Sequence, residues 1–143
     1  MTDYRLIVAD DHPLVRDALT KTLSESYPDG QVDNAGSLDE VVQVLDRDNP
    51  PDLILLDLKM PGVQGFSGLS YLRAQYPEIP VAVISATDDH AVIRRAISFG
   101  ASGYIPKSVP VEDMRAAVDE ILSGEVWVPE AVDLSSEVAL TGQ

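Results

Sequence analysis

Several polar residues in this chain could bind a cation or take part in phosphoryl chemistry, and each follows directly on a short apolar run. They are Asp10, Asp11, Asp57, Ser85 and Lys107. The clearest case is Asp57, which follows four consecutive aliphatic residues, Leu53–Leu56, and is soon followed by the turn pair Pro61-Gly62. A short apolar run closed by turn residues is typical of a strand covered on both faces of a parallel sheet. Ligands of open α/β sheets bind beyond the carboxyl ends of the strands, so Asp57 is expected at a ligand-binding edge.

If the strands end at one edge, these polar groups meet there and the carboxylates repel one another by roughly 1 kcal/mol per pair in water, and by several times that in a partly desolvated cleft. A divalent cation would remove this cost, and an all-oxygen cluster with room for water favours Mg²⁺ over Ca²⁺. Metal, carboxylate, hydroxyl and ammonium together suit phosphoryl transfer with Asp57 as nucleophile. Taken singly, Asp11 could instead cap the first helix, and Lys107 could simply pair with an aspartate.

The elements that position these residues alternate regularly along the chain. Apolar runs predict strands over residues 5–9, 31–35, 53–56, 80–84 and 103–107, the second near a sheet edge. Apolar residues at helical spacing predict helices that start near Pro13, near Ser37, before Leu69, after Asp88 and at Ser108. Fivefold alternation of this kind implies an α/β fold with a parallel sheet, right-handed crossovers and helices on both faces.

Local signals predict where several of these helices begin and end. Ser37 and Glu40 form a capping-box pattern in which the hydroxyl and the carboxylate satisfy first-turn amides. Asp88 is the expected N-cap of the fourth helix, and Gly100 is its expected C-terminal glycine. The last helix is expected over residues 108–122, with Gly124 just past its end.

Composition bounds the class of protein. The chain has 143 residues, is 45% hydrophobic and contains no cysteine, which fits one domain in a reducing compartment and excludes thiolate metal sites. A net charge of −14 makes the chain alone a poor binder of DNA or anionic membranes, although the acidity could also reflect only solubility. Residues 1–5 lack signal-peptide features, and apolar runs are too short to span a bilayer, so a cytoplasmic protein without membrane association is expected.

Over residues 4–123 the sequence resembles the receiver domain of bacterial two-component response regulators. The matching motifs are Asp10-Asp11, Leu55-Leu56-Asp57-Leu58 followed by Met60-Pro61-Gly62, Ser85-Ala86, and Gly100-Ala101 followed by Gly103-Tyr104 and Lys107. Asp11-His12-Pro13-Leu14-Val15-Arg16 and Gly100-Ala101-Ser102-Gly103-Tyr104-Ile105 further resemble the LuxR/NarL/FixJ-type subfamily. The resemblance implies a flavodoxin-like (CheY-like) doubly wound sheet with strand order 2-1-3-4-5 and five helices.

The resemblance also implies a role for each matched residue. Asp57 would accept a phosphoryl group from the phosphohistidine of a sensor histidine kinase. Mg²⁺ would be held by Asp11, by Asp57, by the backbone carbonyl of Lys59 and, through water, by Asp10. The phosphoryl group would be bound by Ser85, by the Ala86 amide and by Lys107. Tyr104 would be an aromatic switch that turns inward when Ser85 moves, with an ordinary half-buried strand tyrosine as the alternative.

Other residues near these motifs have smaller expected roles. Lys59 and Thr87 each lie two residues beyond a site residue and would tune the lifetime of the acyl phosphate. His12 is expected to point to solvent rather than bind the metal. The protein would be a phosphoacceptor with self-catalysed phosphoryl transfer and autodephosphorylation rather than an enzyme. An aspartyl-nucleophile phosphatase is disfavoured, because such enzymes generally carry a second acid where Lys59 stands.

The predicted division is a receiver domain over residues 1–124 and a linker over residues 125–143. Leu140-Thr141 resembles the opening of the subfamily's DNA-binding domain, so we expect a truncated chain whose helix-turn-helix domain is missing and would carry DNA binding. The resemblance implies homodimerisation on phosphorylation, through the first and last helices or through the face of the fourth. Arg94, Arg95 and Arg115 could contribute to such an interface, although solvated charge is the expected role of each. The alternatives are a stand-alone receiver and a phosphate-independent interaction scaffold.

Overall fold

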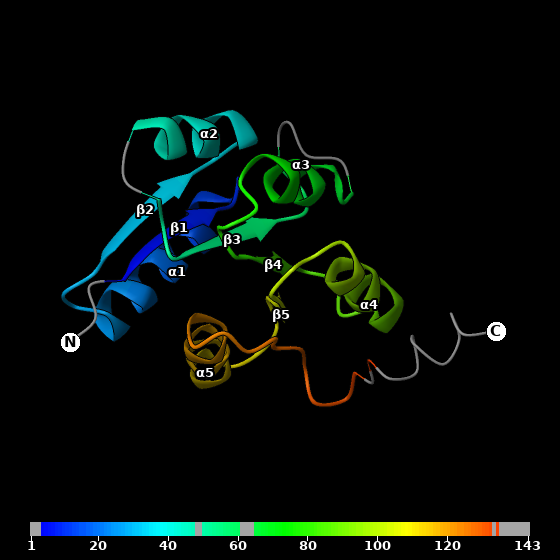
Figure 1. The fold of residues 1–143 in the computed structure, drawn as a ribbon. Coiled ribbons are helices and arrows are strands. Elements are labelled where there is room, and N and C mark those ends of the chain that lie inside the picture. Colours follow the sequence, from blue (N-terminus) through cyan, green and yellow to red (C-terminus); the bar gives the residue numbers. More distant parts are fainter. Residues whose placement is uncertain (1–3, 48–49, 61–64, 133, 135–143) are drawn as a thin grey trace.

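The computed structural model describes residues 4–47, 50–60, 65–132 and 134. Its sheet has five parallel strands in the order β2-β1-β3-β4-β5, which confirms the predicted topology (Figure 1). The strands are β1 (Arg5–Ala9), β2 (Gln31–Ala35), β3 (Leu53–Asp57), β4 (Val81–Ser85) and β5 (Gly103–Pro106). The helices are α1 (Pro13–Ser26), α2 (Leu38–Arg47), α3 (Ser67–Gln75), α4 (His90–Ser98) and α5 (Val111–Leu122).

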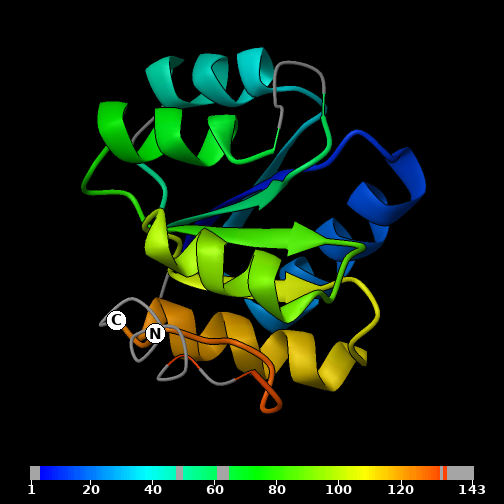
Figure 2. The ribbon, with the colours of Figure 1, turned by 90° about the vertical axis from the view of Figure 1, so that its right-hand side faces the viewer.

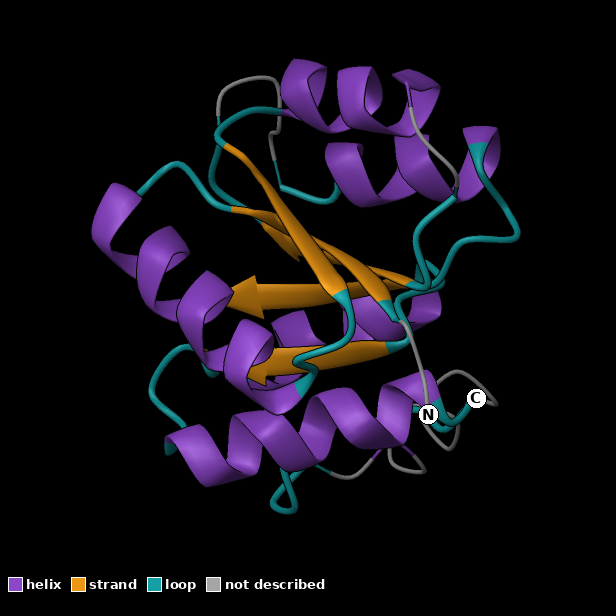
Figure 3. Cartoon of the chain, turned by 90° about the vertical axis from the view of Figure 1, so that its left-hand side faces the viewer, coloured by secondary structure: helices purple, strands orange, loops and turns teal. Residues whose placement is uncertain are grey.

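The sheet lies between two helical layers (Figures 2 and 3). Alternate residues of each central strand enter opposite cores, as the pleat requires. In β3, Leu53 and Leu55 pack toward α1 and α5, whereas Ile54 and Leu56 pack toward α2, α3 and α4. All four side chains are fully buried, which explains why this strand reads as an unbroken apolar run. None of the helices in the described ranges is both long and apolar enough to cross a membrane.

The structure confirms some of the predicted helix ends. The Ser37 hydroxyl accepts a hydrogen bond from the Glu40 amide at 3.2 Å, while the Glu40 carboxylate accepts one from the Gly36 amide at 2.9 Å. The capping box therefore forms, except that the Glu40 carboxylate accepts from the amide of Gly36 instead of that of Ser37. Gly100 has φ +100° after α4, which confirms it as the terminating glycine.

Two predicted helix starts are wrong. The N-cap of α4 is Asp89, whose carboxylate accepts a bond from the Ala91 amide at 2.9 Å, and not Asp88. Helix α5 begins at Val111 rather than at Ser108. Pro110 is its N-cap, and a proline disfavours helical geometry in the residue before it, so the helix cannot begin earlier.

The chain beyond α5 continues to pack on the domain. After Gly124, with φ +98°, it turns back and Trp127 pairs with Gly103 of β5 as an isolated parallel bridge. Val132, only 7% exposed, joins the core on the α4 side. The boundary predicted after residue 124 stays a prediction, although packing extends to Val132. The motifs expected at Pro61-Gly62 and over residues 139–143 lie outside the described residues.

Candidate functional site

The polar residues singled out in the sequence meet at one end of the sheet. Asp10 follows β1, Asp57 ends β3, Ser85 ends β4 and Lys107 follows β5. Asp10, Asp57 and Ser85 are at most 2% exposed. Parallel strands bring their carboxyl ends to the same edge, so the fold itself assembles this cluster from segments far apart in sequence.

Lys107 joins two buried carboxylates. Its Nζ atom lies 2.9 Å from Asp10 Oδ2 and 3.1 Å from Asp57 Oδ2. The Lys107 amide donates to the Ser85 carbonyl at 2.7 Å, which fixes the start of the β5–α5 loop against the end of β4. Lys107 therefore does pair with an aspartate, as the sequence allowed, but it pairs with two aspartates at once. One ammonium against two carboxylates leaves an excess of negative charge in a buried site.

Electrostatics reflect this imbalance. Burial raises the pKa of Asp57 above its usual value, and hydrogen bonds from the Lys59 amide and from Lys107 offset this only in part. Burial acts on Asp10 in the same direction, but bonds from Lys107 and the His12 amide outweigh it and hold the pKa of Asp10 below its usual value. Burial disfavours the charged form of Lys107, yet its two carboxylate partners raise its pKa on balance. Asp57 is therefore the less well neutralised of the two acids.

The residues after Asp10 adopt an arrangement that the sequence did not predict. His12 Nδ1 lies 3.1 Å from Asp11 Oδ1 and 3.2 Å from Asp10 Oδ1, although the His12 side chain is 62% exposed. His12 is thus largely exposed to solvent, as expected, but one of its ring nitrogens faces the acids, and whether it binds the metal stays untested. Asp10, rather than Asp11, accepts the bond from the His12 amide at 2.9 Å, and the N-cap of α1 is His12. The contiguous Asp-Asp-His sequence was the available signal.

The donor set suits a hard divalent cation. Ligand atoms of Asp10, Asp11, His12 and Asp57 all lie within 4.8 Å of one another. Carboxylate oxygens are the preferred ligands of Mg²⁺, and the excess negative charge favours a cation there. The Lys59 amide donates to Asp57 Oδ1 at 3.0 Å, which orients this carboxylate. A ligand role for the Lys59 carbonyl stays a prediction.

The end of β4 connects the carboxylates to Tyr104. Ser85 Oγ accepts a hydrogen bond from the Thr87 amide at 3.3 Å, and the Tyr104 hydroxyl donates to the Thr87 carbonyl at 3.0 Å. Tyr104 is fully buried rather than half-buried, and this burial raises its pKa. Ala86 is exposed beside this loop. The part played by the Thr87 carbonyl has no signature in a side-chain pattern, so the sequence did not reveal it.

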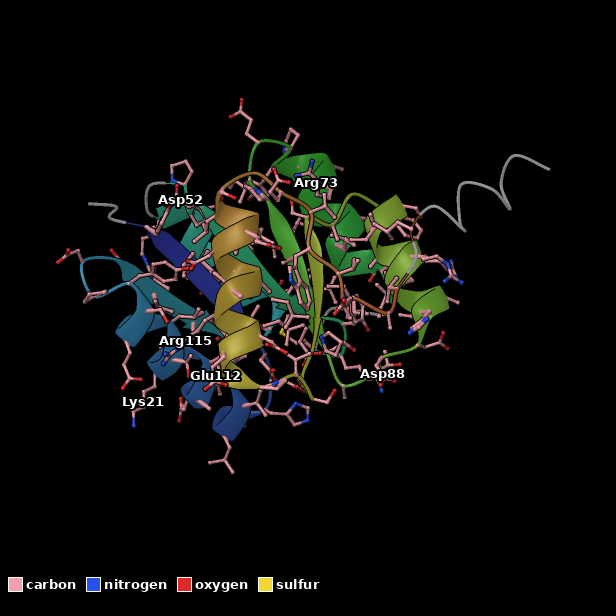
Figure 4. The ribbon with its side chains drawn as sticks, turned by 90° about the horizontal axis from the view of Figure 1, so that it is seen from below. Lys21, Asp52, Arg73, Asp88, Glu112 and Arg115 are labelled. Atoms are coloured by element: carbon pink, nitrogen blue, oxygen red, sulfur yellow. The ribbon has the colours of Figure 1, made fainter. Side chains whose placement is uncertain are left out.

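The arginines considered for dimer contacts lie on two different surfaces. Arg115 projects from α5 (Figure 4) and lies 3.7 Å from Glu25 of α1, and both side chains are well exposed. Arg95 of α4 stacks over the Phe66 ring, 5.4 Å from its centroid. Exposed ion pairs such as that between Arg115 and Glu25 contribute little to stability.

Comparisons with known proteins agree with this geometry. The family described as "Response regulator receiver domain" matches residues 6–119. The chain belongs to the response regulator receiver family. It is 41% identical over 126 residues to the "Glycerol metabolism activator" of Pseudomonas putida, covering 88% of this chain and 57% of that protein. It is 33% identical over 131 residues to the "Nitrate/nitrite response regulator protein NarL" of Escherichia coli, covering 89% and 58%.

A solved structure supports the same assignment. The crystal structure of "a LuxR family DNA-binding response regulator from Silicibacter pomeroyi" superposes with a TM-score of 0.77 at 32% identity, over 90% of this chain and 98% of that one. The receiver fold and the similarity to LuxR/NarL-type response regulators are thereby confirmed. The chain spans a little under three fifths of the length of these curated relatives, at 57% and 58%.

Proposed function

We propose that this receiver domain accepts a phosphoryl group on Asp57 from the phosphohistidine of a sensor histidine kinase, in a Mg²⁺-dependent reaction. The observation that carries the proposal is the incompletely neutralised Asp57, which shares Lys107 with Asp10 at the edge of the sheet. Asp10, Asp11 and Asp57, with the Lys59 carbonyl, would hold the metal, and Asp10 would act through water. Bound Mg²⁺ would neutralise charge on the phosphoryl oxygens.

The side chains of this chain account for the remaining chemistry. A carboxylate oxygen of Asp57 attacks phosphorus, the P–N bond of phosphohistidine breaks, and the imidazole leaves with the electron pair. Lys107 already contacts Asp57 and neutralises the charge that the phosphoryl group brings. Ser85 and the Ala86 amide donate to its oxygens. Attack of water on the acyl phosphate would reverse the modification without an enzyme, and Lys59 and Thr87 would tune that rate.

The modification would act as a switch. The phosphoryl group carries about −1.5 to −2 charges in place of the single charge of the Asp57 carboxylate, so a site that is already too negative becomes more so. Ser85 would turn its hydroxyl toward the phosphoryl group, away from the Thr87 amide that it now accepts from. Since Thr87 also holds the Tyr104 hydroxyl, the loop and the tyrosine would rearrange together. Tyr104 therefore fits the proposed switch role, and differential contacts of this kind shift an existing equilibrium.

The proposed output is control of transcription by phosphorylation-dependent homodimerisation. A chain with a net charge of −14 is poorly suited to contact DNA itself, so DNA binding would belong to a further domain joined to the linker at residues 125–143. Transfer from a sensor kinase in this way implies a cytoplasmic location.

Incubation with acetyl phosphate and Mg²⁺ tests the proposal, with intact mass as the readout. We expect a phosphoryl adduct that is lost in Asp57→Asn and when EDTA replaces Mg²⁺. Asp29→Asn removes an exposed carboxylate in the turn between α1 and β2, far from the site in sequence, and should label like the parent. No labelling would favour the phosphate-independent scaffold. Rapid turnover of phosphoesters would favour a phosphatase.

A further inference from the structure

Residues 126–132, named the strap below, run along the outer edge of β5. The Tyr104 amide donates to the Trp127 carbonyl at 3.0 Å, and the Trp127 amide donates to the Ser102 carbonyl at 3.2 Å. A Cβ atom on Gly103 would lie 3.0 Å from the Trp127 carbonyl oxygen and 2.5 Å from Ile121 Cδ1. Glycine at position 103 thus permits the strap to approach the strand this closely.

The far end of the strap packs on a different element. Val132 is 7% exposed and belongs to the core cluster on the face of the sheet that α2, α3 and α4 cover, where α4 is the helix that packs against β5. Figures 1 and 2 show the segment leaving α5 and passing β5 toward α4. The strap is therefore held at two places, by backbone bonds to β5 and by side-chain burial near α4.

Tyr104 connects this segment to the site. Its amide holds the strap at Trp127, and its hydroxyl donates to the Thr87 carbonyl at 3.0 Å. The Thr87 amide in turn donates to Ser85 Oγ. Thr87 also reaches the start of α4, because its hydroxyl oxygen accepts from the Asp89 amide at 3.3 Å. Both attachments of the strap are thus within a few hydrogen bonds of Ser85.

We propose that the strap is a latch that is docked while Asp57 is unmodified and released when Asp57 carries a phosphoryl group. This inference rests on the proposed function of Asp57. A phosphoryl group that recruits Ser85 draws its Oγ atom out of reach of the Thr87 amide, from which it now accepts at 3.3 Å, and the loop that begins α4 moves with Thr87. A strap anchored on both β5 and α4 then loses one of its two attachments. Because the strap precedes the expected DNA-binding region, its release changes the freedom of whatever follows.

The docked state has a built-in probe, because Trp127 is the only tryptophan in the chain. The experiment adds Mg²⁺ and beryllofluoride, a phosphoryl analogue, to the 143-residue chain. Binding of the analogue is followed separately by fluorine NMR. Hydrogen exchange of the Trp127 and Tyr104 amides is expected to speed up at least tenfold, and Trp127 emission to shift to the red, while the Val83 amide in β4 keeps its protection.

Paired variants separate the latch from a general loosening. Val132→Asp removes the buried attachment, whereas Val126→Asp adds the same charge at a residue of the strap that is 54% exposed. In Val132→Asp, the Trp127 and Tyr104 amides should exchange rapidly before any analogue is added. Because the coupling between strap release and binding is reciprocal, this variant should also bind beryllofluoride several-fold more tightly. Val126→Asp should behave like the parent chain.

The outcomes distinguish the two claims. If beryllofluoride binds and both amides keep or increase their protection, the latch is refuted while the proposed function of Asp57 stands. If the analogue does not bind in the presence of Mg²⁺, the proposed function fails and the latch fails with it. The measurement on the parent chain needs no variant, so it decides between docking and release even where the Val132→Asp protein does not fold.

Discussion

Asp57→Asn should stabilise the fold at pH 7 in the absence of divalent cations. We expect the free energy of unfolding to rise by about 1–3 kcal/mol, because the substitution removes a buried charge that is incompletely neutralised. Asparagine keeps the shape of the side chain and an oxygen that can accept from the Lys59 amide. Lys107 keeps Asp10 as its partner.

The magnitude follows from the distances. At an effective dielectric constant near 20, the 3.1 Å contact with Lys107 attracts Asp57 by about 5 kcal/mol. Ligand atoms of Asp10 and Asp11 within 4.8 Å repel it by about 3 kcal/mol each, less for the more exposed Asp11. Attraction and repulsion nearly cancel, so the cost of taking the Asp57 carboxylate out of water remains. That cost is several kcal/mol for a buried ion, and the Lys59 bond offsets part of it.

The effect should depend on pH with a definite sign. Burial raises the pKa of Asp57 in the folded state above its unfolded value. The penalty is therefore complete above the folded-state pKa, shrinks as the pH falls through it, and is gone below the unfolded-state pKa. Asp10, whose pKa is lowered, stays ionised over that window. The advantage of Asp57→Asn should accordingly shrink as the pH is lowered from 7.

Urea unfolding in EDTA at pH 7 and at lower pH measures this difference. Asp29→Asn is the matched control, since it removes an exposed carboxylate and should change the free energy of unfolding by no more than about 0.5 kcal/mol. An Asp57→Asn protein that is equally or less stable than the parent at pH 7 would show that Lys107 and Lys59 fully compensate the buried charge. The electrostatic reasoning behind the metal site would then be wrong.

Three further outcomes are expected. Lys107→Met leaves two buried carboxylates without their cation and should cost about 3–5 kcal/mol in urea unfolding at pH 7, less at lower pH as Asp57 takes up a proton. Tyr104→Phe deprives the Thr87 carbonyl of its donor and should cost about 1 kcal/mol, visible as a lower melting temperature. Mg²⁺ at a hundred times its dissociation constant should stabilise the parent by about 2.7 kcal/mol, an effect that EDTA reverses and Asp57→Asn weakens.

The sequence predicted the strands, and with them the meeting of the polar residues at one edge of the sheet, because both depend on local patterns. Four aliphatic residues before Asp57 are enough to indicate a buried parallel strand, and parallel strands necessarily end together. The roles assigned to all of the site residues remain predictions. The structure brings together Asp10, Asp57, Ser85 and Lys107 as expected.

The features that the sequence did not predict correctly depend on a choice between two similar neighbouring residues, or on pairing between segments that lie far apart in the sequence. Asp88 and Asp89 have the same capping chemistry, and only the backbone path selects Asp89. Pro110 was the signal for a later start of α5 but was overridden by the apolar spacing that follows it. The pairing of Trp127 with Gly103 joins segments that no periodicity links, so the strap could not be predicted from either segment alone.

Strand order also explains why the cation of this site is a lysine and the hydroxyl a serine. β4 lies directly beside β3, so the short side chain of Ser85 ends next to Asp57. β5 is separated from β3 by β4, a span of about 10 Å at the usual strand spacing, and from β1 by a further strand. Only a long side chain starting just past β5 can cross the end of β4 and reach both acids. Because Lys107 reaches Asp10 and Asp57 with one atom, any group that draws it toward Asp57 also loosens its hold on Asp10. The charge state of Asp57 is thereby transmitted, through a single ammonium group, to the acids that are proposed to bind the metal.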